Sequence, residues 1–77
     1  MRLTAKQVAT LKVVAAYEER YGKRCWAGRE GTTTAVLEVL VSKGLCDRVR
    51  GEHGLRWWYG LTEAGRTELA ARAKAIA

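Results

Sequence analysis

The sequence predicts a small α+β fold of three helices and a two-stranded β-hairpin, in which the second of the helices is short or missing. Apolar residues recur at helical spacing in separate segments, and two strand-like runs flank a glycine-containing turn. With 8 Gly and no Pro, glycine must separate these segments. The chain has room for one domain, residues 1–77, and domains of this size bury only about 60% of their unfolded surface. A large enzyme pocket is therefore not expected.

The first helix is expected between Thr4 and Gly22. Thr4 and Gln7 have the spacing of a capping box, in which two otherwise unpaired backbone donors are satisfied. Gly22 is a natural C-terminal stop after Tyr21. The apolar stripe of this helix consists of Val8, Leu11, Val14 and Ala15.

The segment of residues 23–31 is too short and too glycine-rich for a second helix of two turns. At most one short helical turn is expected around residues 25–29. Trp26 is expected to anchor the segment to the core.

The next helix is expected over residues 33–43, with Thr32, Thr33 and Thr34 as candidate N-caps. Its apolar stripe consists of Val36, Leu37, Leu40 and Val41, and Lys43-Gly44-Leu45 is expected to end it and lead into a strand.

The hairpin is expected to pair residues 46–50 with residues 55–61 around Gly51-Glu52-His53-Gly54. Alternation along the second strand places Leu55, Trp57, Tyr59 and Leu61 toward the core, with Arg56 and Trp58 on the other side. Trp58 is expected either to pack under the loop at Trp26 or to meet a partner.

The last helix follows Thr62, which is its expected N-cap. Leu69, Ala73 and Ile76 form a thin apolar stripe. This stripe could pack on the first helix of the same chain or on a symmetry mate, and the sequence leaves both open.

This order of helix, glycine turn, hairpin and capped helix is that of a winged helix, whose wing is the hairpin. The phrases SKGLCDR at residues 42–48 and LTEAGR at residues 61–66 resemble winged-helix regulators of the MarR type. That resemblance implies sequence-specific DNA binding, usually as a dimer, with residues 33–43 in the major groove and residues 50–56 near the minor groove. The chain also resembles small winged-helix DNA-binding proteins of phages and mobile elements.

The charge balance favours an anionic partner, since 14 Lys and Arg face 8 Asp and Glu, giving +6 and a pI near 9.8. Arginine matches phosphate oxygens, and exposed helix-start amides hold phosphate. Glu38 could accept from a cytosine amino group, and Thr34 or Ala35 could meet a thymine methyl. The candidate nucleic-acid-binding residues are Arg48, Arg50, His53 and Arg56 in the hairpin, Thr33, Thr34, Ala35, Glu38 and Lys43 in the helix, and Lys23, Arg24 and Arg29 in the loop.

Enzymatic activity is not expected, because paired carboxylates, an oriented Cys–His pair and a phosphate-binding Gly-Lys-Ser/Thr loop are all lacking. Cys25, Cys46 and His53 lack the paired spacing of metal ligands, so no cofactor or metal is expected. The polar start MRLTAKQ and the lack of an apolar run of about 18 residues predict a cytoplasmic protein, nucleoid-associated when bound to DNA, with no membrane partner.

The sequence thus predicts a non-enzymatic protein that binds double-stranded DNA, as a transcriptional regulator or an accessory factor. The alternative is an interaction module that docks on a protein partner through Trp58 and the face of residues 34–43 that carries Val39. A third hypothesis is single-stranded nucleic-acid or RNA binding, with Trp58 stacking on a base. Whether the chain forms a homodimer is left open.

Overall fold

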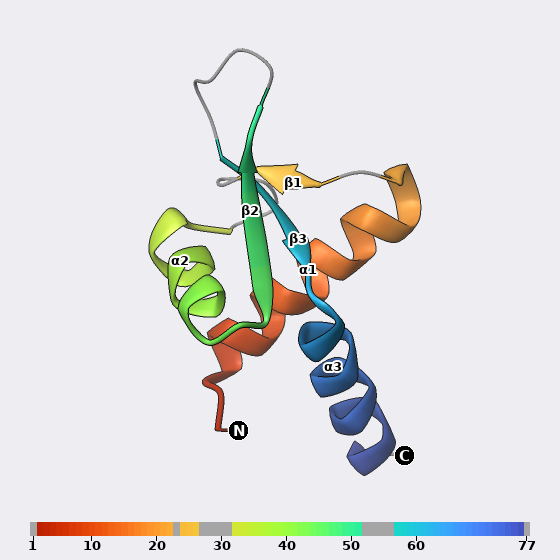
Figure 1. Cartoon of the computed structure of the whole chain (residues 1–77). Coiled ribbons are helices and arrows are strands. Elements are labelled where there is room, and N and C mark those ends of the chain that lie inside the picture. Colours follow the sequence, from red (N-terminus) through yellow and green to blue (C-terminus); the bar gives the residue numbers. More distant parts are fainter. Residues whose placement is uncertain (1, 23, 27–31, 52–56, 77) are drawn as a thin grey trace.

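The computed structural model describes residues 2–22, 24–26, 32–51 and 57–76, and its elements follow the chain from α1 to α3 (Figure 1). These elements are α1 (Ala5–Tyr21), β1 (Cys25–Trp26), α2 (Thr34–Ser42), β2 (Cys46–Arg50), β3 (Trp57–Leu61) and α3 (Glu63–Ile76). The three helices and the β2–β3 hairpin confirm the predicted small winged helix of the α+β class.

The described part of the sheet is antiparallel, with the strand order β1-β3-β2. In the hairpin, Arg48 lies opposite Tyr59 and Arg50 lies opposite Trp57. Those two pairs place Arg48 and Arg50 on the same side of the sheet as Tyr59 and Trp57, because side chains alternate along a strand.

The helical turn predicted around residues 25–29 is wrong at its first two positions, where the chain forms β1. Cys25 pairs with Tyr59, and Trp26 pairs with Trp58. Without β1, the second edge of β3 would present unpaired backbone N–H and C=O groups. Pairing these groups outweighs the local helical preference of residues 25 and 26. Residues 27–29 lie outside the described part of the chain.

The predicted helix ends are confirmed. In α1, the Gln7 amide donates to Thr4 Oγ1 at 3.1 Å, and the Thr4 amide donates to Gln7 Oε1 at 3.0 Å. Gly22 ends α1 with a φ of 66°. Thr33 is the N-cap of α2, where its Oγ1 accepts from the Val36 amide at 3.4 Å.

Lys43 and Gly44 end α2 as predicted. Lys43 is the C-cap, and Gly44 has a φ of 77°, a backbone conformation that glycine adopts without steric cost. The Leu45 amide then donates to the Leu40 carbonyl at 3.0 Å, which turns the chain into β2.

The core lies between α1, α2 and one side of the sheet. Its buried members are Leu11, Val14, Leu37, Leu40, Leu45, Cys46, Tyr59 and Leu61. The predicted stripes of α1 and α2 and the inward direction of Tyr59 and Leu61 are thereby confirmed, with Val8 and Ala15 half-buried. Trp57 is also half-buried and packs at the margin of this core.

The last helix extends away from α2 on the other side of the molecule (Figure 1). Leu69 packs against the core, and α3 contacts α1 of the same chain. For Leu69, the structure therefore shows the first of the two predicted packing modes. Ala73 is exposed, and the side chain of Ile76 lies outside the described part.

Candidate nucleic-acid interface

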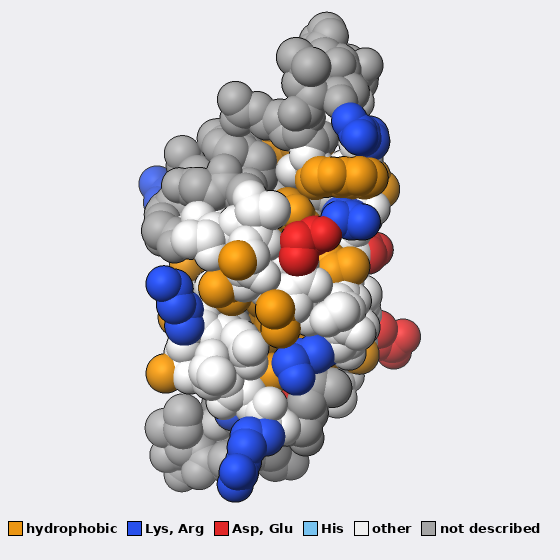
Figure 2. Space-filling view, turned by 90° about the vertical axis from the view of Figure 1, so that its left-hand side faces the viewer, with side chains coloured by type: hydrophobic (Ala, Val, Ile, Leu, Met, Phe, Trp, Pro, Cys, Tyr) orange, Lys and Arg blue, Asp and Glu red, His pale blue; other side chains and the backbone are white. Residues whose placement is uncertain are grey.

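The outward side of α2 carries small, uncharged side chains, with a lysine at its C-terminal end. We define the α2 face as the exposed residues Thr33, Thr34, Ala35, Val39, Ser42 and Lys43. The first turn of α2 contains no acidic residue, so its positive end is not neutralised there. Figure 2 views the molecule from this side and shows hydrophobic and uncharged side chains bordered by basic ones, with acidic side chains among them.

The α2 face borders two arginines of β2. The Arg48 guanidinium lies 4.3 Å from the centroid of the Trp57 ring, and that of Arg50 lies 4.7 Å from the same centroid. Both distances are within the range of cation–π attraction. Trp57 therefore restrains both guanidinium groups beside α2.

Glu38 connects α2 to the hairpin. Its Oε1 is ion-paired with Arg48, and its Oε2 accepts a hydrogen bond from the Tyr59 hydroxyl at 3.0 Å. Burial raises the pKa of Tyr59, and the hydrogen bond to the Glu38 carboxylate raises it further, so the hydroxyl stays a donor. As a result, part of the positive charge of Arg48 is compensated from within the protein.

Arg24 lies elsewhere. Its guanidinium forms an ion pair with Asp47, on the side of the sheet opposite to that of Arg48, and this hydrogen bond raises the pKa of Arg24. To reach Asp47 on β2, the Arg24 side chain passes over Gly60 of β3. A Cβ added at Gly60 would lie 2.8 Å from the Arg24 Nη1. The structure thus does not bring Arg24 to the α2 face, and its predicted phosphate contact stays a prediction.

The structure therefore brings seven of the predicted candidates together at α2 and β2: Thr33, Thr34, Ala35, Glu38, Lys43, Arg48 and Arg50. Four others, Lys23, Arg29, His53 and Arg56, lie outside the described residues. Their roles stay predictions.

Sequence reasoning missed two residues that shape this region. Trp57 and Tyr59 were expected only as core residues, yet Trp57 stacks with Arg48 and Arg50, and Tyr59 bonds to Glu38. Their spacing on one side of β3 was visible in the sequence. The pairing register that sets them opposite Arg50 and Arg48 was not.

Trp58 is half-buried on the other side of β3. Its indole lies so close to Gly51 that a Cβ at this glycine would overlap the ring nitrogen. Contact with the hairpin backbone at Gly51 accounts for part of its burial, and its backbone pairs with Trp26. Trp58 thus contacts the hairpin of its own chain, whereas its packing under the loop at Trp26 stays a prediction.

The phrase LTEAGR, residues 61–66, packs against the segment that links α2 to β2. We define the joint as residues 44–46 together with residues 61–66. Thr62 Oγ1 donates to the Gly44 carbonyl at 2.6 Å and accepts from the Gly65 amide at 3.1 Å. The Thr62 amide donates to the Leu45 carbonyl at 3.1 Å. A Cβ at Gly65 would overlap this same carbonyl oxygen, so the backbones meet too closely for any other residue.

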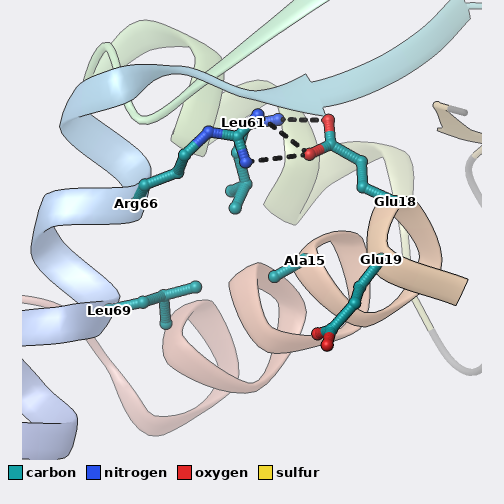
Figure 3. A pocket seen from close by; sticks show the side chains of 6 residues that line it. All are labelled: Ala15, Glu18, Glu19, Leu61, Arg66 and Leu69. Atoms are coloured by element: carbon teal, nitrogen blue, oxygen red, sulfur yellow. Dashed lines mark hydrogen bonds and ion pairs between the residues drawn. The ribbon is translucent and has the colours of Figure 1, made fainter. Parts of the chain in front are cut away.

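Glu18 of α1 completes the joint. Its carboxylate accepts from the Leu61 amide at 3.1 Å and forms an ion pair with Arg66 at 3.1 Å (Figure 3). The groove around this pair has Ala15 and Glu19 on α1 and Leu69 on α3. Glu18 and Arg66 thus neutralise each other within this groove.

The cysteines are buried in the sheet, at the start of β1 and of β2. Burial raises the pKa of the Cys46 thiol to about 12, which keeps it protonated. Within the described ranges, no three His, Cys, Asp or Glu side chains gather as metal ligands. None of the described helices combines the length and apolar character needed to cross a membrane.

Comparison with known proteins gives one informative likeness. No protein-family model matches the chain, and no curated protein does. The chain is similar to the crystal structure of a probable transcriptional regulator from Pseudomonas aeruginosa, with a TM-score of 0.76 and 29% identity. The match covers 96% of this chain but 59% of that one, so the chain spans well under two thirds of the regulator's length. The likeness supports a regulator-type winged helix, and the narrower MarR-type and phage resemblances stay predictions.

Proposed function

We propose that this chain is a non-enzymatic DNA-binding protein of the transcriptional-regulator type, or an accessory DNA-binding factor. It contacts duplex DNA with the α2 face and the hairpin arginines. The observation that carries the proposal is that Arg48 and Arg50 lie on the same side of the hairpin as α2. The likeness to a probable transcriptional regulator supports the same function.

The start of α2 suits a phosphate. Thr33 caps the Val36 amide, while Thr34 and Ala35 are exposed at the helix end that carries partial positive charge. Their side chains are short, so a DNA backbone can approach the helix closely. The Thr34 and Ala35 methyl groups also suit contact with a thymine methyl in the major groove.

The hairpin supplies the charge. Arg50, whose guanidinium stacks on Trp57, is proposed to meet a phosphate or a narrow minor groove, where the negative potential is enhanced. Lys43 adds a cation at the far end of α2. Arg56 and His53 are proposed to extend this surface along the hairpin, and Lys23 and Arg29 along the loop.

The test is binding of a fluorescently labelled duplex, followed by anisotropy across a salt series. The logarithm of affinity should fall linearly with the logarithm of salt, with a slope of about −0.9 for each phosphate neutralised. Replacing Arg50→Ala and Arg56→Ala together should flatten the slope by about two units.

The matched control removes the same charge elsewhere, with Lys12→Ala and Arg72→Ala. Lys12 lies on the exposed stripe of α1 that continues to Glu19 in the groove, and Arg72 lies on α3. This pair should leave the slope nearly unchanged. If the two double variants changed the slope equally, binding would depend only on the net charge of the chain and not on the hairpin arginines. If the wild-type chain showed no salt-dependent binding, DNA binding would be refuted.

A second function is favoured by one observation. Val39 exposes 38% of its surface in the middle of the α2 face, where an apolar side chain suits a protein interface. In this alternative the chain docks on a partner protein or on a second copy of itself. Val39→Asp should then abolish partner capture or dimer sedimentation, whereas Arg50→Ala should not. Capture retained by Val39→Asp would remove this alternative.

A further inference from the structure

Glu38 poses an electrostatic question for the proposed function. It projects from the middle of α2, beside the face proposed to meet a polyanion, and 37% of its side chain is exposed. An isolated carboxylate there would repel phosphates and swing toward solvent. The structure instead holds it in place.

Two donors from the sheet fix this carboxylate. Arg48 of β2 pairs with Oε1, and the Tyr59 hydroxyl of β3 donates to Oε2 at 3.0 Å. Trp57 in turn restrains Arg48, with the guanidinium 4.3 Å from its ring centroid. Both carboxylate oxygens keep a second acceptor position, because each can accept more than one hydrogen bond.

We propose that Glu38 is a specificity-determining residue, which favours base edges that present an amino group in the major groove and disfavours the others. This inference rests on the proposed function. An ionised carboxylate only accepts hydrogen bonds, so it matches the amino groups of cytosine and adenine. It opposes the acceptor edge of guanine at O6 and N7, that of thymine at O4, and the backbone phosphates.

The pair with Arg48 strengthens this selection. Arg48 is partly compensated by Glu38, so it attracts phosphates less than a solvated arginine does. Sequence-independent binding is thereby weakened, and discrimination is the difference between specific and non-specific affinity. Glu38 acts in both directions, because it lowers affinity for the wrong duplex and accepts a donor from the right one.

The experiment selects duplexes with a randomised centre on four proteins: the wild type, Glu38→Gln, Glu38→Asp and Glu19→Gln. Glutamine at position 38 removes the charge, and its amide oxygen can still accept from Tyr59. Glu19, exposed in the groove between α1 and α3, provides the matched loss of one negative charge (Figure 3). Each protein is then titrated with unselected duplex across a salt series.

The wild type and Glu19→Gln should enrich cytosine or adenine at one position by about tenfold, and Glu38→Gln should lose that preference. The Glu38→Gln protein should also bind unselected duplex several-fold more tightly than Glu19→Gln, with a slope steeper by about one unit. A Glu38→Asp protein, which keeps the charge but withdraws the carboxylate, should lose the base preference while keeping the wild-type salt slope.

Three results would overturn the inference. If the wild type binds duplex but enriches no base, or if Glu38→Gln enriches the same bases as the wild type, Glu38 does not determine specificity and the proposed function still stands. If neither the wild type nor Glu38→Gln binds any duplex, the proposed function itself fails. Urea unfolding checks that Glu38→Gln is folded. If Glu38→Gln does not fold, Glu38→Asp tests the same base preference.

Discussion

The joint and the α2 face differ in what their residues do for the fold. At the joint, Leu61 is buried, Thr62 bonds to the backbone on both sides, and Gly65 lies against the Leu45 carbonyl. On the α2 face, Thr34, Ala35 and Val39 are exposed. The most recognisable phrase of the sequence, LTEAGR, therefore serves the fold, through close packing at Gly65, the hydrogen bonds of Thr62 and the ion pair of Arg66 with Glu18.

This difference separates evidence for fold from evidence for function. Substitutions at the joint should lower stability and reach DNA binding only by unfolding the chain. Substitutions at Thr34, Ala35 and Val39 on the α2 face should change binding with little effect on stability. Four sets of substitutions test that division, beginning with the largest change in unfolding free energy.

The joint is most sensitive at Gly65. Replacing Gly65→Ala should lower the free energy of unfolding by about 3 kcal/mol, because the new methyl group overlaps backbone rather than a movable side chain. Urea unfolding followed by circular dichroism measures this. The control Ala64→Gly, at an exposed neighbour, should cost no more than about 1 kcal/mol. If Gly65→Ala proved neutral, the close approach at the joint would be disproved.

The two N-cap threonines allow a direct comparison of the regions. Thr62→Ala should cost roughly 1–2 kcal/mol, since it removes a cap and also the bond to the Gly44 carbonyl. Thr33→Ala should cost about half as much, because Thr33 only caps α2, at 3.4 Å. Thr62→Ser keeps the hydroxyl and should stay near the wild type. Equal losses for the two alanine variants would argue against the special role of the joint.

Cys46 makes the joint sensitive to alkaline pH. Its pKa is raised by burial from 9.0 to about 12, so the folded state holds the proton that the unfolded state releases. The stabilisation is complete below pH 9 and is lost as the pH rises toward 12. Between pH 8 and 10 the wild type should lose roughly 1 kcal/mol more than Cys46→Ala. Urea unfolding measures the free energy of unfolding of both proteins at each pH. If the two values changed equally between pH 8 and 10, the burial argument would be contradicted.

The smallest stability effect is expected on the α2 face. Val39→Thr should change the free energy of unfolding by no more than about 0.5 kcal/mol, because Val39 is exposed. By contrast, Leu37 lies in the core two positions earlier, and Leu37→Ala should lower the free energy of unfolding by roughly 2–5 kcal/mol. Urea unfolding measures both. A large loss for Val39→Thr would mean that the α2 face also serves the fold.

Most of the fold could be predicted from local patterns. Thr4, Gly22, Thr33 and Thr62 mark helix ends through chemistry within a few residues, and the structure confirms all of them. The strand β1 could not be predicted, because two residues carry no periodicity. Its cause is the distant edge of β3.

The candidate site was predictable in its residue types but not in its pairings. The arginines of β2 stand out in the sequence, yet their partners Glu38 and Trp57 depend on strand register and on how α2 lies against β2. Arg24 was grouped with a basic loop because of its neighbours in sequence. Its partner Asp47 is 23 positions away, a contact that no local pattern indicates.

Whether the α2 face and β2 meet duplex DNA is tested most directly by backbone amide chemical shifts during titration with a short duplex. We expect changes concentrated at residues 33–43 and 46–51, which weaken as salt is added, with residues 63–73 of α3 little affected. Changes concentrated on α3 and the groove beside Glu18, or no changes at low salt, would contradict DNA binding by the α2 face and β2.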